Sequence, residues 1–161
     1  MEIDFRKKRA LELWTEGQEL QRRGKLEKAV ELYKKSIDIF PTAEAYTFLG
    51  WAFSFQGRID DAISQCKQAI EVDPTLGNPY NDIGSYLIGQ GNLDEAIQWL
   101  EKAKSASRYE AKHFPYINLG RVFAAKGLIL RAITEFEGAL KICPDDPTSV
   151  SALKELRNAI N

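Results

Sequence analysis

Three stretches of the chain share one arrangement of small and large residues. They are LGWAFSFQGRIDDAISQCKQAIEVDP at 49–74, IGSYLIGQGNLDEAIQWLEKA at 83–103 and LGRVFAAKGLILRAITEFEGALKICP at 119–144. In each, a second glycine follows the first after seven residues, and an alanine follows after five more. A weaker copy around Gly17, Gly24 and Ala29 precedes them, and the four alanines, Ala29, Ala62, Ala96 and Ala132, are spaced by 33, 34 and 36 residues. A period near 34 predicts a solenoid of four stacked units.

The spacing of small residues predicts a pair of antiparallel helices in each unit. The first glycine and the alanine let two helices approach closely, and the second glycine ends the first helix because it tolerates positive φ. A proline ends the second helix in three units, at Pro41, Pro74 and Pro144. Large side chains four residues after each alanine are expected to fill the seam between the helices; they are Tyr33, Cys66, Leu100 and Phe136.

This pattern resembles the tetratricopeptide repeat family over roughly residues 10–146. The resemblance implies an all-α fold, a right-handed α-solenoid of antiparallel helix pairs, in one domain spanning 1–161. Its units are expected at 10–43, 43–76, 77–110 and 113–146, with a capping helix at 147–161. Two departures stand out: Arg108 replaces the terminal proline of the third unit, and SASRYEAKHF (105–114) holds two extra residues, which predicts a different angle at the third junction.

Nine helices are expected, each with an error of a few residues. They are placed at 4–23, 26–40, 43–56, 59–72, 78–90, 93–107, 114–126, 129–142 and 147–159. In the last one, an apolar stripe is expected to close the open side of the fourth unit; it consists of Val150, Leu153, Leu156 and Ile160.

Composition excludes several classes of function. The 161 residues carry a formal net charge of −1, which argues against a dedicated nucleic-acid binder. No apolar run is long enough to cross a membrane, and no secretory signal is evident at the N-terminus. Two widely separated cysteines favour a reducing compartment, so a cytoplasmic location is expected. The basic run Arg6–Arg9 is interpreted as a solvated helix face, with an import or nucleic-acid patch as the alternative.

No constellation of residues predicts catalysis, a metal or a cofactor. His113 is the only histidine, and Cys66 and Cys143 are expected to act as small apolar fillers. The glycines of GQGNLDE (89–95) are explained by the repeat, and no phosphate-loop lysine follows them. The acidic pairs at 60–61, 94–95 and 145–146 lie at predicted helix starts, where they cap the helix or complement its dipole. The chain is therefore expected not to be an enzyme.

The family resemblance places a partner-binding groove on the concave side, lined by the first helix of each unit. The expected lining residues are Trp14, Gln18, Arg22, Thr47, Trp51, Phe55, Asn81, Ser85, Ile88, Phe114, Ile117 and Arg121. We expect Trp14, Trp51 and Phe55 to be exposed, whereas Ile88 and Ile117 suit the groove and the core equally. Large aromatic side chains on such a surface are typical of binding hot spots.

The resemblance implies an adaptor or scaffold that binds a peptide or helical segment of a partner protein. One branch of the family binds acidic chaperone tails with a lysine, arginine and asparagine clamp, but the matching positions here include Trp14, Gln18, Phe48, Asn78 and Asp82. Such positions cannot hold two carboxylates, so binding of acidic tails is not expected. Two alternatives remain open: a secretion-type chaperone for a hydrophobic client, and self-association into a larger scaffold.

Overall fold

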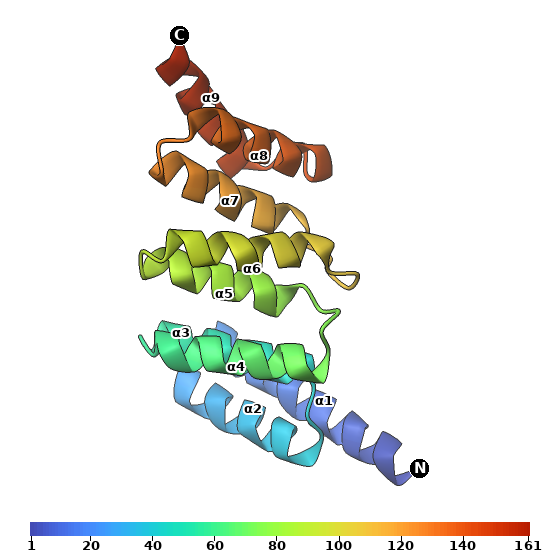
Figure 1. Cartoon of the computed structure of the whole chain (residues 1–161). Helices are drawn as coiled ribbons and strands as arrows, with labels where there is room; N and C mark the ends of the chain where they lie inside the picture. The colour runs from blue at the N-terminus through green and yellow to red at the C-terminus, as the bar shows by residue number, and fades with distance from the viewer.

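The chain folds into nine α-helices that stack as consecutive antiparallel pairs, with the two termini at opposite ends of the stack (Figure 1). The computed structural model describes residues 1–161. The helices are α1 (Glu2–Arg22), α2 (Leu26–Ile39), α3 (Ala43–Phe55), α4 (Ile59–Val72), α5 (Asn78–Gly89), α6 (Leu93–Ser105), α7 (His113–Ala125), α8 (Ile129–Ile142) and α9 (Pro147–Ile160). The all-α solenoid expected from the sequence is confirmed.

The glycines that were expected to end the first helices do so. Gly24, Gly57, Gly91 and Gly127 have φ values of 78°, 77°, 80° and 75°, and they are the only residues of the chain with positive φ. A side chain is strained in this region, whereas glycine adopts it freely. The predicted helix boundaries are accurate to within two residues, with α6 ending at Ser105 and not at residue 107.

Close contacts explain the first glycine of each unit. A Cβ atom at Gly84 would lie 2.5 Å from the Leu100 side chain, and one at Gly50 would lie 2.8 Å from the backbone oxygen of Ala62. Tyr33, Cys66, Leu100 and Phe136, the large residues predicted at these seams, are all buried. Each pair of helices is therefore held by a small residue on one helix facing a large one on the next.

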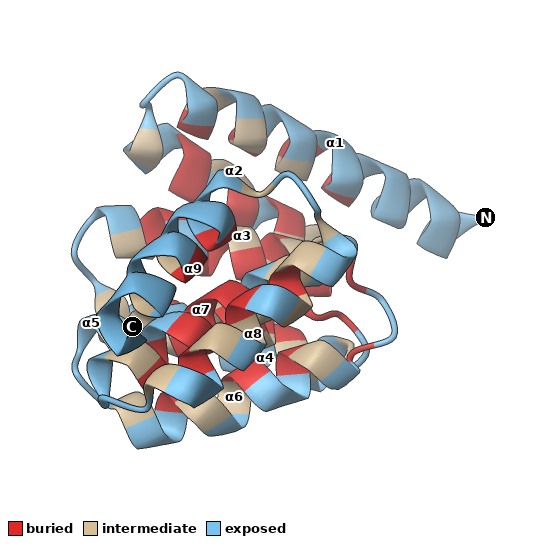
Figure 2. Ribbon diagram, turned by 90° about the horizontal axis from the view of Figure 1, so that it is seen from above, coloured by how far each residue is buried: buried red, intermediate tan, exposed pale blue.

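The contacts between neighbouring pairs give the stack its curvature. The first helices pack against one another, α1 with α3, α3 with α5 and α5 with α7, whereas no two second helices are among the packed pairs. The first helices therefore line the inner, concave side of the stack. Seen from above, buried residues follow the faces between helices, while the N-terminal part of α1 projects beyond them and is exposed (Figure 2).

The expected apolar stripe of α9 is only half correct. Leu153 is buried and Leu156 packs against the core, but Val150 and Ile160 are each 51% exposed. Among the helices, α9 packs chiefly against α8, so only a narrow stripe of it is covered. Asp146 caps this helix as expected, because its side chain accepts a hydrogen bond from the backbone N–H of Ser149 at 2.8 Å.

The basic run at the N-terminus lies on an exposed face of α1, as interpreted from the sequence. Arg6 to Arg9 are all exposed, and Arg9 pairs with Glu12 at 3.2 Å. Arg6 donates a hydrogen bond to the backbone oxygen of Ile39, at the end of α2, at 2.6 Å. One member of the run thus tethers α2, and the others are solvated.

The two extra residues of the third junction form a connection that reaches back across the stack. Arg108, between α6 and α7, donates hydrogen bonds to Glu44 of α3 at 2.8 Å and to Asp73, just after α4, at 2.7 Å. Its backbone N–H donates to the oxygen of Thr75, and its backbone oxygen accepts from Gly77, both at 3.0 Å. The residue that replaces the missing proline therefore joins the α6–α7 connection to the α4–α5 connection.

Replacing Arg108 with alanine is expected to lower the free energy of unfolding by about 0.5–1 kcal/mol. The loss is small because the Arg108 side chain is half exposed, where ion pairs contribute little. Urea unfolding of the variant beside Lys154→Ala, an exposed lysine that makes no ion pair, measures it. An equal change in both variants would show that the Arg108 contacts contribute nothing.

Candidate functional site

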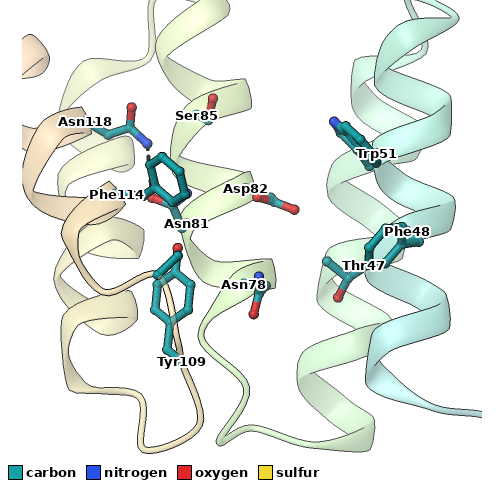
Figure 3. Close-up of a pocket in the computed structure, with 11 residues that line it drawn as sticks. Thr47, Phe48, Trp51, Asn78, Asn81, Asp82, Ser85, Tyr109, Phe114 and Asn118 are labelled. Atoms are coloured by element: carbon teal, nitrogen blue, oxygen red, sulfur yellow. Dashed lines mark hydrogen bonds between the residues drawn. The ribbon is translucent and has the colours of Figure 1, made fainter. Parts of the chain in front are cut away.

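The concave side holds a cavity of about 500 Å³ between α3, α5 and α7. The α6–α7 connection contributes part of its wall, so the extra residues of the third junction help to shape it (Figure 3). The lining residues are Thr47, Phe48, Trp51, Asn78, Asn81, Asp82, Ser85, Tyr109, Ala111, Phe114 and Asn118. Five of these residues are apolar or aromatic and six are polar, so the wall combines apolar contact area with groups that can orient a ligand.

One wall of the groove is a row of four aromatic rings, which we call the aromatic ladder: Trp14, Phe48, Trp51 and Phe55. Successive rings meet edge to face, with centroid distances of 5.4, 5.8 and 5.2 Å. Exposure rises along the ladder, from the half-buried Trp14 and Phe48 to Trp51 at 43% and Phe55 at 60%. The exposed end offers rigid apolar area at low conformational-entropy cost.

Asp82 is the only charged residue that lines the cavity. It lies on α5, half-buried, and its carboxylate points from α5 toward Trp51 and Phe48 (Figure 3). No side chain of this structure forms an ion pair or hydrogen bond with it. Burial without a partner disfavours the charged form and raises the pKa of Asp82 from its ordinary value to about 7.

The remaining polar groups on the wall are neutral, and some are already bonded. The Asn118 amide nitrogen donates to the Asn81 side-chain oxygen at 3.0 Å, which links α7 to α5. The Thr47 hydroxyl donates to the backbone oxygen of Ala43 at 2.7 Å. Asn78 and Ser85, which make no such bond, remain available to a ligand.

The structure brings together part of the residue set expected from the sequence. Thr47, Trp51, Asn81, Ser85 and Phe114 line the cavity, and Phe114 is 46% exposed. Trp14 and Gln18 line an adjoining cavity of about 770 Å³. The other expected residues line neither; they are Arg22, Phe55, Ile88, Ile117 and Arg121.

The position three residues before each first glycine, which was expected to line the groove, is largely buried. Thr47, Asn81 and Ile117 are 4%, 8% and 5% exposed, and Trp14, which was expected to be exposed, is half-buried with its indole N–H unpartnered. First helices of adjacent pairs pack on each other, so this position lies between units. Ile117 belongs to the core and Ile88 packs against it, which answers the question that the sequence left open.

Other residues of the cavity were not expected to bind a partner. Phe48, Asp82 and Asn118 each precede a first glycine by two residues, and this shared register could have identified them. Tyr109 and Ala111 come from the connection with the extra residues, and no repeat register reaches them. Arg22 pairs with Glu19 on its own helix, and Arg121 is exposed outside the cavities.

The residues considered for chemistry occupy structural positions. His113 is the first residue of α7, Cys66 is buried, and Cys143 follows the end of α8. Burial, and then the nearby Asp82, raise the pKa of the Cys66 thiol. No group of three or more potential ligands for a metal ion occurs.

The repeat pattern decides the family. The model of the tetratricopeptide repeat matches this sequence four times, at residues 13–42, 43–76, 78–109 and 115–146. The chain is a tetratricopeptide repeat protein. Members of this family generally act as non-enzymatic scaffolds that bind other proteins, so the repeats support a role in protein interaction.

Similar proteins share the repeats over part or most of the chain. "Small glutamine-rich tetratricopeptide repeat-containing protein 2" of Mycosarcoma maydis is 36% identical over 75 residues, 46% of this chain and 21% of that protein. The chain thus matches about a fifth of that relative's length. Among solved structures, Pseudomonas aeruginosa pilF has a TM-score of 0.88 at 24% identity, covering 94% of this chain and 68% of that one. YrrB, described as having an unusual peptide-binding site, has a TM-score of 0.69 at 17% identity and coverages of 93% and 77%.

None of the nine helices is both long and apolar enough to cross a membrane.

Proposed function

We propose that this repeat protein is an adaptor that binds a peptide or helical segment of another protein in its concave groove. The observation that carries the proposal is the aromatic ladder, whose exposed end borders the cavity between α3, α5 and α7. Trp51 and Phe55 are not needed to fill the seams between helices, where Tyr33 and Cys66 are the buried large residues. Exposed rigid rings beside a cavity are the features of a binding hot spot.

The size of the groove suits a short segment. A cavity of about 500 Å³ accommodates one or two side chains, while the adjoining cavity extends the surface toward α1. Ordering a flexible peptide opposes binding, so an affinity in the range of about 1–100 μM is expected for one short segment.

Replacing both Trp51 and Phe55 with alanine is expected to weaken such binding by about tenfold or more, and to change the free energy of unfolding by less than about 1 kcal/mol. Peptides selected on the wild-type protein from a displayed random library serve as probes, and their affinities are measured by calorimetry. Leu130→Ala is the matched control, because Leu130 is 70% exposed on α8, away from the groove.

Loss of binding in the double variant, with none in the control, would support the groove. If no peptide is enriched, or if both variants bind equally well, the proposal fails. Self-association is then tested by sedimentation at increasing protein concentration, because an apolar surface that binds no peptide can still pair with another copy.

A further inference from the structure

We propose that the cavity between α3, α5 and α7 is a specificity pocket for one basic side chain, lysine or arginine, of the bound segment, with Asp82 as its counter-charge. This inference rests on the proposed function, because the cation is presented by the peptide that the groove binds. The expected occupant is thus a long side chain that carries a positive charge at its end.

The charge of the cavity is complementary to that of a basic side chain. Asp82 is a carboxylate without an ion pair, and no lysine, arginine or histidine lines the cavity with it. Two cations, Arg108 and Lys112, line the adjoining cavity; Arg108 is bonded to Glu44 and Asp73, and Lys112 forms no ion pair with Asp82. The protein therefore provides no partner for this charge, whereas a basic side chain entering from the groove would supply one.

The walls of the cavity hold aromatic rings on both sides of Asp82. Phe48 and Trp51 lie on the α3 side of Asp82, and Tyr109 and Phe114 lie on the other side (Figure 3). Aromatic rings attract ammonium and guanidinium groups through their electron-rich faces, and they also cover the aliphatic stem of a long basic side chain. Asn78 and Ser85 offer oxygens that can accept the remaining hydrogen bonds of the cation.

Acidic and purely apolar side chains fit this cavity less well than a basic one. An acidic peptide side chain or a terminal carboxylate would meet Asp82 with like charge and would find no cation in the wall. A purely apolar side chain would leave the carboxylate buried without a partner, which is costly. A basic side chain satisfies both the rings and the charge.

Binding through this pocket is expected to depend on pH. The titratable groups that feel the Asp82 charge are Cys66 of α4, Tyr86 of α5 and Tyr109 of the α6–α7 connection; burial, and then this charge, raises the pKa of each, so all three are neutral at pH 8. The α3 and α7 walls contribute only uncharged residues. In the unbound protein the pKa of Asp82 is about 7, so below that pH a bound cation must displace the carboxyl proton. The affinity for a basic peptide should therefore rise from pH 6 to pH 8.

The test pairs two peptides with two proteins. A peptide selected on the wild-type protein is synthesised in two forms, one with its lysine and one with norleucine at that position. Norleucine has nearly the same shape as lysine but lacks the charge. Each is titrated into the wild type and Asp82→Asn at pH 8. We expect the wild type to prefer lysine by about tenfold and Asp82→Asn to bind the two peptides within about threefold of each other. Asp38→Asn, an exposed acid on α2, controls for the loss of one negative charge and should keep the full preference.

The outcomes separate this inference from the proposed function. If selected peptides require Trp51 and Phe55 but contain no basic residue, or if Asp82→Asn keeps the lysine preference, the pocket assignment is wrong while the adaptor role stands. If the lysine preference is lost in Asp38→Asn as well, the attraction is long-range and not local to the pocket. Circular dichroism and the melting temperature show whether Asp82→Asn is folded. If it is misfolded, Phe114→Leu replaces it as the test, because this variant removes a ring and keeps the charge. We expect Phe114→Leu to reduce the preference for lysine by about threefold, and an unchanged preference would overturn the assignment.

Discussion

Replacing Gly50 with leucine is expected to lower the free energy of unfolding by about 3 kcal/mol or more. The position allows no side chain, because a Cβ there would lie 2.8 Å from the backbone oxygen of Ala62 and 3.3 Å from the Cys66 sulfur. A flexible side chain can rotate away from such a contact, whereas a backbone oxygen moves only if α4 moves with it. The second pair of helices must then separate, which exposes the buried Phe53 and Leu49.

Gly89→Leu is the matched control for this prediction. Gly89 is also helical, but nothing lies within 4 Å of a Cβ built on it, and its φ is not positive. We expect the control to change the free energy of unfolding by less than about 1 kcal/mol. Chemical denaturation followed by circular dichroism compares the two variants; equal losses would mean that the penalty comes from leucine itself and not from the close approach of α3 and α4.

Replacing Asp82 with asparagine is expected to stabilise the protein at pH 8 by about 2 kcal/mol. The pKa of Asp82 is about 7 in the folded chain and near 4 when unfolded, so the folded state binds the extra proton. Stability therefore falls as pH rises from about 4 to about 7 and is constant above that. The full shift would correspond to about 4 kcal/mol, and we expect half of it because Asp82 keeps partial contact with solvent.

The gain in Asp82→Asn should therefore shrink toward zero near pH 4, where the wild-type carboxyl is neutral in both states. Urea unfolding at pH 4.5, 6 and 8 measures the trend. A gain that is the same at every pH would reflect better packing of the amide, and a loss at pH 8 would show that the carboxylate is stabilising. A variant that is more stable but no longer distinguishes lysine from norleucine would show that the carboxylate is retained for binding at the expense of stability.

The fold followed from the sequence because local rules and the repeat agree. Gly57 and Gly127 end their helices because glycine adopts positive φ freely, and Ala62 and Leu100 fit the seams because one is small and the other large. The same pattern recurs in every unit, so one unit predicts the helices of the others. The candidate site followed from the sequence only in part. The repeat register predicts Thr47, Trp51 and Ser85, which line the cavity, but Ile117 lies in the core, and burial between units is not visible in a single helix pattern.

Tyr109 and Arg108 could not be placed from the sequence for a different reason. They lie where the third junction departs from the repeat, so no other unit supplies a template for them. Asp82 was visible as a departure from the clamp pattern, but the absence of an ion pair at Asp82 and of any cation in its cavity is a property of the folded arrangement. A departure from the repeat can indicate which segment shapes a site, but the contacts of its residues follow only from the structure.

The contacts of Arg108 have a mechanical consequence. In most stacked repeats each unit touches only its neighbours, so the array can unzip one unit at a time from either end. Here a side chain at the end of the third unit is bonded to α3 of the second unit, and its own backbone N–H and oxygen are bonded to the α4–α5 connection, so this junction is fastened by more than helix packing. Under tension applied at the two termini, α1–α2 and α8–α9 can peel away independently, whereas the segment from α3 to α6 is fastened along its edge and must yield as one block. The groove lies largely on that block, so its walls keep their spacing while the ends of the solenoid flex.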